Sequence, residues 1–136
     1  MKQEIAVRIA EALESGEYNQ VKGRLKDISG FCCLGVGTDL YLKDTRQVWG
    51  IDKNGNFYFQ DQYGCLPMRV MDWGGFEDEA GRPRGGKDLF EGILNYDGLP
   101  VLDLDGKPFA SLASANDQGV PFKTIAKALR KNWHLL

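Results

Sequence analysis

The sequence has little of what most enzymes and metalloproteins use. Its 136 residues include one histidine, His134, and three cysteines. A catalytic Ser–His or Cys–His couple would depend on that one histidine, which lies at the C-terminal edge of the sequence. The nucleophile motif GxSxG and the zinc motif HExxH are both absent. A zinc site needs several ligands at fixed spacing, which one histidine cannot complete. We therefore expect no catalytic residues, no metal and no cofactor, and a protein that is not an enzyme.

The cysteines do not have the pattern of a disulfide framework. Cys32 and Cys33 are neighbours, Cys65 stands alone, and the total is odd. We expect free and mostly buried thiols. The opening stretch MKQEIAVRIAEALESG carries acidic residues among the apolar ones and lacks the hydrophobic core of a signal peptide. No apolar run approaches the roughly 20 residues that cross a bilayer. These features predict an intracellular protein without membrane contact.

The charge balance argues against one class of partner. The chain has 17 basic and 19 acidic residues, which gives a formal net charge of -2. Binding to nucleic acid regardless of its sequence usually needs a clear basic excess. Hydrophobic residues make up 43% of the chain, which is enough to fill one core. We expect a single domain, residues 1–136.

Helical periodicity marks both ends of the sequence. Residues 2–15 place Ile5, Ile9 and Leu13 on one face, which predicts an amphipathic helix. Residues 111–133 predict a helix, a tight turn and a second helix. The segment 31–43 is compatible with a buried strand or a buried helix, and we favour a helix whose two glycines allow another element to approach closely. A short helix over 67–74, with Pro67 in its first turn, follows.

A β-hairpin is predicted over residues 48–60. Asn54-Gly55 is the strongest short hairpin signal, and aromatic residues occupy both faces of the strands around it. Centring a two-residue turn there pairs Asp52 with Phe57 and Ile51 with Tyr58.

Another short strand is expected in LPVLDLDGKPF, ended by an Asp-Gly turn. Asp103 and Asp105 would share one face of it, where they are more typical of a solvated strand edge than of acid–base chemistry. The whole pattern predicts an α+β fold, in which N-terminal and C-terminal helices pack on a small antiparallel sheet.

The stretch GRPRGGKD, residues 81–88, has the glycine and lysine frame of a phosphate-binding P-loop. Asp88 stands where that motif needs Ser or Thr, and no strand precedes Gly81. The sequence therefore does not predict a P-loop. Two interpretations stay open: a solvated surface loop, or a flap that closes Arg82 and Arg84 over an anionic small molecule.

Two features of the C-terminal segment each permit a structural and a functional interpretation. Asn116 and Asp117 either end a helix or present polar side chains to a ligand. The last helix carries an outer stripe of basic residues that resembles half of a DNA-binding helix-turn-helix, although basic residues in a last turn also suit the helix dipole. That stripe consists of Lys123, Lys127, Arg130 and Lys131.

Four motifs resemble those of short proteins carried by tailed bacteriophages and prophages. They are G-R-L at residues 23–25, F-C-C-L-G-V at 31–36, L-P-x-x-V-x-x-W at 66–73 and N-D-x-G-x-x-F-x-x-I-A at 116–126. Gly37-Thr38 departs from the bulky and cysteine residues expected after Val36, so local packing is expected to differ.

The resemblance implies a small accessory protein that acts against host defence by binding something in the host cytoplasm. We expect a homo-oligomer that sequesters a nucleotide-derived immune signal, a small anionic ligand. Arginines suit its phosphate, aromatic rings suit its base, and an amide or carboxylate would read the base edge. The corresponding candidates are Arg24, Arg82 and Arg84; Trp49, Phe57 and Tyr58; and Asn116 and Asp117.

Two alternatives remain. The aromatic face of the hairpin would serve a protein that inhibits a host defence factor by direct contact. The basic last helix would serve an accessory protein that binds nucleic acid.

Overall fold

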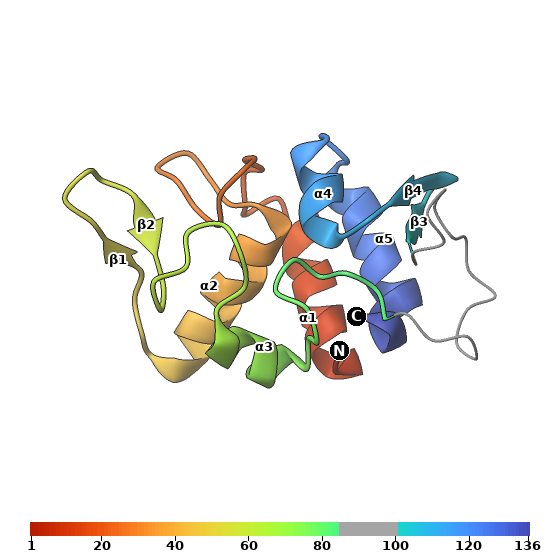
Figure 1. Ribbon diagram of the computed structural model, residues 1–136, viewed down its shortest axis with the longest axis horizontal. Helices are drawn as coiled ribbons and strands as arrows, with labels where there is room; N and C mark the ends of the chain where they lie inside the picture. Colours follow the sequence, from red (N-terminus) through yellow and green to blue (C-terminus); the bar gives the residue numbers. More distant parts are fainter. Residues whose placement is uncertain (85–100) are drawn as a thin grey trace.

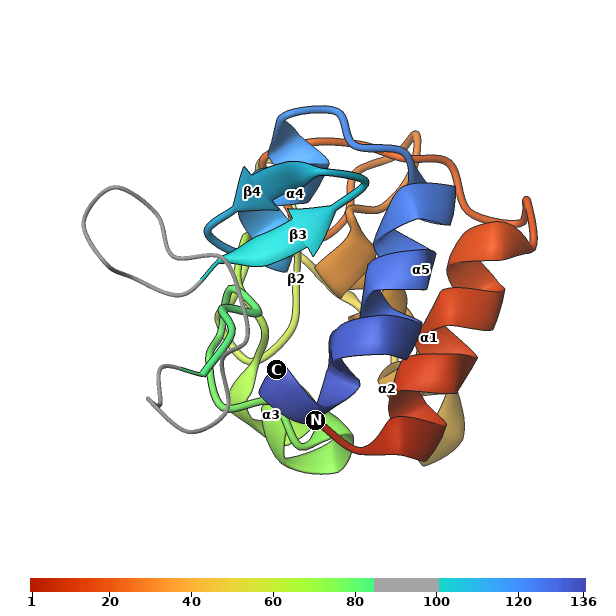
Figure 2. The same cartoon turned by 90° about the vertical axis from the view of Figure 1, so that its right-hand side faces the viewer.

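Two helices from opposite ends of the sequence lie side by side in the core. The computed structural model describes residues 1–84 and 101–136. Helix α1 (Gln3–Glu14) and helix α5 (Phe122–Asn132) run along each other (Figures 1 and 2). Both were predicted from their periodicity. Their buried faces consist of Ile5, Ile9 and Leu13 on α1 and of Phe122, Ile125, Ala126 and Leu129 on α5.

Helix α2 (Cys33–Thr45) confirms the helical interpretation of residues 31–43. Its glycines are the points at which other elements come close. A Cβ on Gly35 would lie 1.7 Å from the carbonyl oxygen of Leu25, and one on Gly37 would lie 3.1 Å from the side chain of Ile9. Gly35 therefore lets the loop that precedes α2 lie directly against the helix backbone.

The first hairpin forms where it was predicted, but its register is shifted by one residue. Strands β1 (Gly50–Ile51) and β2 (Phe57–Tyr58) pair Ile51 with Phe57 and Gly50 with Tyr58. The predicted pairing of Ile51 with Tyr58 was wrong. The carboxylate of Asp52 accepts hydrogen bonds from the backbone N–H groups of Asn54 and Asn56, both at 2.9 Å, and this widens the turn by one residue.

A second hairpin spans residues 102–109. Strands β3 (Leu102–Leu104) and β4 (Lys107–Phe109) are antiparallel; β3 was predicted, but its partner β4 was not. Asp105 and Gly106 form the turn, with φ angles of 52° and 83°. The expectation that Asp103 and Asp105 share one strand face was wrong, because Asp105 has left the strand and lies in the turn.

The remaining elements are short. Helix α3 (Met68–Gly74) forms where it was predicted, with Pro67 at the position just before the helix and not in its first turn. Helix α4 (Leu112–Asp117) leads through Gly119, at φ 85°, into α5, and a final 3-10 turn, η1 (Trp133–Leu135), ends the chain. The predicted succession of a helix, a tight turn and a second helix over residues 111–133 is confirmed. The described residues thus form an α+β fold, with five α-helices and two antiparallel sheets of two strands each.

The close approach at Gly35 gives a test of this packing. Gly35→Ala should lower the free energy of unfolding by roughly 3 kcal/mol, because the new methyl group meets a backbone oxygen that cannot move without displacing the loop. The matched control is Gly64→Ala, whose Cβ would meet only one atom, at 3.8 Å, and should change stability by less than about 1 kcal/mol. Urea unfolding measures both variants. Equal stability of the two variants would contradict the packing described here.

Candidate functional site

Asn116 is fully buried, and its carboxamide makes four hydrogen bonds within the chain. Its oxygen accepts from the backbone N–H of Cys33 (3.1 Å) and from the side chain of Gln20 (3.0 Å). Its nitrogen donates to the backbone oxygen of Val21 (2.8 Å) and to Asp117 (3.3 Å). Two donors and two acceptors are all that an amide side chain has. Asn116 therefore has no polar capacity left with which to read a ligand.

Asp117 holds the same loop at a second point. Its carboxylate accepts a hydrogen bond of 2.8 Å from the backbone N–H of Gly23. Two residues further on, the N–H of Leu25 donates to the carbonyl of Tyr63 (2.7 Å), and the carbonyl of Leu25 accepts from Cys32 (3.1 Å). The backbone of residues 23–25 is thus anchored on both sides of Arg24, whose side chain is exposed.

A pocket of about 230 Å³ lies between this loop and the first hairpin. The guanidinium of Arg24 makes one long hydrogen bond, 3.5 Å, to the side chain of Asn56. The ammonium of Lys26 lies over the rings of Phe31 and Phe57, at 4.1 and 4.6 Å from their centroids. The pocket therefore combines two cations with aromatic surface. Its lining consists of Gly23, Arg24, Lys26, Asn56, Phe57 and Tyr63.

Tyr58 and Tyr63 extend the aromatic surface, with ring centroids 5.5 Å apart. The hydroxyl of Tyr63 donates to Asp52 at 3.2 Å. Hydrogen bonds from Asn56 and Asn54 hold the pKa of Asp52 below its usual value, so this carboxylate stays ionised while it supports the turn. We name the surface formed by Arg24, Lys26, Phe57, Tyr58 and Tyr63 the Arg24 site.

Trp49 does not belong to this site. Its indole N–H donates to Asp39 on α2 at 3.0 Å, and its ring lies 6.3 Å from that of Phe31. Asp39 also accepts from the hydroxyl of Tyr18 (2.7 Å) and pairs with Lys43 (3.0 Å). Trp49 therefore anchors the start of the hairpin to α2, a role that leaves its N–H engaged.

The arginines of the stretch 81–88 lie elsewhere as well. Arg82 pairs with Asp78 at 3.3 Å, and Arg84 pairs with Glu77 while its backbone N–H donates to the carbonyl of Leu135. This places residues 81–84 beside the C-terminal end of the chain. Among the residues that the structure describes, no hydrogen bond or ion pair joins them to Arg24. Gly85 to Asp88 fall outside the described residues, so the flap is described only in its first half.

The basic residues of α5 border an acidic surface on α1. Arg130 donates two hydrogen bonds to the carboxylate of Glu14, one of them at 2.9 Å. These bonds, helped by Lys123, hold the pKa of Glu14 below its usual value. Lys127 and Lys131 are exposed. The stripe is therefore partly neutralised by α1, which lessens its suitability for a phosphate backbone.

The thiols are free, as predicted, and the two neighbouring ones are buried. Burial raises the pKa of Cys32 to about 11 and raises that of Cys33 well above its usual value. Neither forms a thiolate readily near neutral pH. Within residues 1–84 and 101–136, no group of three His, Cys, Asp or Glu side chains is placed to hold a metal. In the same part of the chain, no helix is long and apolar enough to cross a membrane.

The structure thus brings together three of the eight predicted ligand-binding residues: Arg24, Phe57 and Tyr58. Sequence reasoning missed Lys26, Asn56 and Tyr63. The run Arg24-Leu25-Lys26 did carry a signal, because a single apolar residue between two cations is expected to be buried while its neighbours face outward, and Leu25 is buried.

The buried carboxamide provides a stability test. Asn116→Asp keeps the shape but removes the hydrogens that Val21 and Asp117 accept, and it places a second carboxylate beside Asp117. We expect a loss of about 3 kcal/mol in the free energy of unfolding at neutral pH. Asn54→Asp, in the exposed hairpin turn, is the control and should stay within about 0.5 kcal/mol of the parent. If both variants unfold at the same urea concentration, Asn116 does not hold the loop.

Asp39 provides a pH-dependent test. Burial pushes the pKa of Asp39 up, but the hydrogen bonds from Trp49, Tyr18 and Lys43 outweigh it and hold the pKa below its usual value. Because the folded pKa lies below the unfolded value of about 3.9, the ionised form stabilises the fold above that value, and this stabilisation is lost as the pH falls through the folded pKa. Asp39→Asn should therefore cost about 2 kcal/mol at pH 7, and the cost should shrink below about pH 4.

The measurement is the free energy of unfolding of parent and variant across that pH range. Asp72→Asn, an exposed change on α3, is the control and should cost nothing measurable. A cost for Asp39→Asn that is independent of pH would show that its ionised form does not stabilise the fold.

Comparison with known proteins places the chain in a family. No curated protein and no solved structure matches it. The sequence pattern of the family described as "Domain of unknown function (DUF8296)" matches residues 1–133, which is nearly the whole chain. The chain belongs to the DUF8296 family.

Proposed function

We propose that this protein binds a small anionic ligand of the nucleotide type at the Arg24 site and does not convert it chemically. The observation that carries the proposal is the presence of Arg24 and Lys26 beside the rings of Phe57 and Tyr63 in one pocket. A guanidinium binds phosphate oxygens through paired N–H donors, and aromatic rings stack on a base.

The hydrogen-bonding state of Arg24 supports this role. Within the described part of the chain, its guanidinium makes only the 3.5 Å bond to Asn56, so most of its five N–H donors are available. Its backbone is held by the bonds of Gly23 and Leu25. A cation on an anchored loop loses less conformational entropy when it binds than one on a mobile loop.

The size of the pocket supports a ligand shared between copies of the chain. Small-molecule sites usually measure about 300–1,000 Å³, and this one measures about 230 Å³. It would hold a phosphate group and one ring, with the rest of the ligand outside. A homo-oligomer would cover that remainder with a second wall.

The resemblance to short phage proteins supports the biological setting. In that setting the ligand is a nucleotide-derived immune signal of the host, and the protein lowers its free concentration in the host cytoplasm. Such a role needs affinity and abundance but no catalytic group.

A second candidate function is inhibition of a host protein through the hairpin. The observation that favours it is the exposure of Val48, two residues before β1, and of Ile51, in β1, which are 82% and 59% exposed. Exposed aliphatic residues close together often mark a contact with another protein. If small ligands fail to bind, capture from host lysate by the parent protein but not by Ile51→Asp would favour this function.

A thermal-shift screen tests the proposed function. The probes are linear and cyclic di- and trinucleotides, NAD, and ADP-ribose and its cyclic isomers. A ligand at a hundred times its Kd should stabilise the fold by about 2.7 kcal/mol and raise the melting temperature by several degrees. Arg24→Ala and Phe57→Ala should remove the shift, because they remove the phosphate contact and the stacking surface.

Arg69→Ala is the matched control, because Arg69 is exposed on α3 and lies away from the pocket lining. It should keep the full shift. A flat screen, or a shift that survives in Arg24→Ala, would overturn the proposal.

A further inference from the structure

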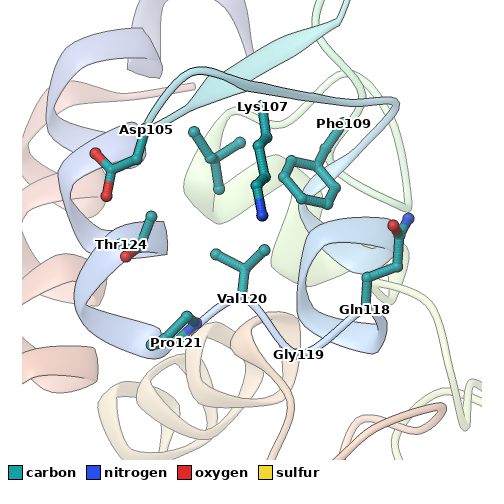
Figure 3. A pocket seen from close by; sticks show the side chains of 9 residues that line it. Asp105, Lys107, Phe109, Gln118, Gly119, Val120, Pro121 and Thr124 are labelled. Carbon is teal, nitrogen blue, oxygen red and sulfur yellow. The ribbon is translucent and has the colours of Figure 1, made fainter.

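A second pocket, of about 360 Å³, lies between the β3–β4 hairpin and the turn that joins α4 to α5 (Figure 3). The hairpin contributes Leu104, Asp105, Lys107 and Phe109, the turn contributes Gln118, Gly119, Val120 and Pro121, and the first turn of α5 contributes Thr124. None of these was predicted to bind a ligand. The volume falls in the lower part of the range for small-molecule sites, about 300–1,000 Å³.

The floor of this pocket is apolar. Leu104 and Phe109 are buried, at 3% and 6% exposure, and belong to the main core. Val120, which is half-buried, lies on the turn, across the pocket from Phe109 (Figure 3). An apolar group of about the size of an amino-acid side chain would cover this floor and leave contact with water.

Two opposite charges stand above the floor. The Lys107 side chain points into the pocket toward Val120, while Asp105 lies on the side of Thr124 (Figure 3). The ion pairs found within residues 1–84 and 101–136 involve neither Asp105 nor Lys107. Their charges are therefore not neutralised by each other or by another described side chain.

We infer that this pocket binds a small zwitterion of the α-amino-acid type. Lys107 binds its carboxylate, Asp105 binds its ammonium group, and the floor of Leu104, Phe109 and Val120 takes an apolar side chain. The hydroxyl of Thr124 adds a polar contact beside Asp105. A ligand with one charge would leave the opposite charge of the pocket unmatched, whereas a zwitterion matches both.

This site is independent of the Arg24 site. The two pockets share no lining residue. The two proposals can therefore fail separately.

Titration of the ¹⁵N-labelled full chain with free L-leucine, L-methionine and L-phenylalanine tests the inference. Binding should shift the backbone amide signals of residues 104–109 and 118–124. The N-acetyl and C-terminal amide derivatives of the same amino acids each lack one charge. Each should bind about tenfold or more weakly, as expected for the loss of a charge-assisted hydrogen bond.

The variants Lys107→Gln and Asp105→Asn should weaken binding of the free amino acids by a similar factor, about tenfold. Asn suits the left-handed turn position of residue 105, so the hairpin should fold. The controls are Lys123→Gln, which changes a lysine outside the lining, and Arg24→Ala, which changes the other site; both should bind as the parent does. Absence of shifts in the parent, or equal binding by Lys107→Gln, would overturn the inference.

Discussion

The buried carboxamide of Asn116 is the interaction on which the arrangement of the other parts depends. It joins α4 to the first turn of α2, through Cys33, and to the loop after α1, through Gln20 and Val21. These groups lie up to 96 residues from Asn116 in the sequence. A buried backbone group without a partner costs about as much as a lost hydrogen bond, so no apolar residue of similar size would serve here.

The position of the Arg24 site depends on the hydrogen bonds of Asn116 and on the absence of a side chain at Gly35. Asn116 and Asp117 hold the loop at Val21 and Gly23, and Gly35 has no side chain to keep the loop away from α2. Arg24 projects from the stretch that these contacts fix. Asn116 and Asp117, which were predicted to contact a ligand, instead hold the loop that carries Arg24. The sequence segments F-C-C-L-G-V (residues 31–36) and N-D-x-G-x-x-F (residues 116–122) meet at this point, through the hydrogen bond between Cys33 and Asn116.

Features that depend on residues close together in the sequence, such as helices and the hairpin turn, could be predicted. Features that depend on contacts between distant segments could not. Periodicity located α1 and α5, and Asn54-Gly55 located the first hairpin. The register was missed because a side chain, Asp52, reshapes the turn. Asn116 was misleading because a helix-ending asparagine and one with distant hydrogen-bond partners look alike in sequence. The pocket of the Arg24 site combines residues 23–26 with residues 56–63, and the second pocket combines residues 104–109 with residues 118–124. No local pattern reveals either combination.

The net charge of the chain is negative, yet Arg24 and Lys26 remain available to bind an anion. The reason is that the carboxylates near them form hydrogen bonds with backbone N–H groups. Asp117 accepts from the backbone of Gly23, Asp52 from the hairpin turn, and the carboxylate of Asp27 from Ser29 and Gly30. Each of these acids stabilises a turn by binding N–H dipoles instead of pairing with Arg24 or Lys26. Their hydrogen bonds also hold the pKa values of Asp27 and Asp52 below their usual values, so both carboxylates are ionised at neutral pH. An acidic protein can in this way carry a locally cationic site, because its nearby carboxylates accept hydrogen bonds from backbone N–H groups and do not form ion pairs with the cations.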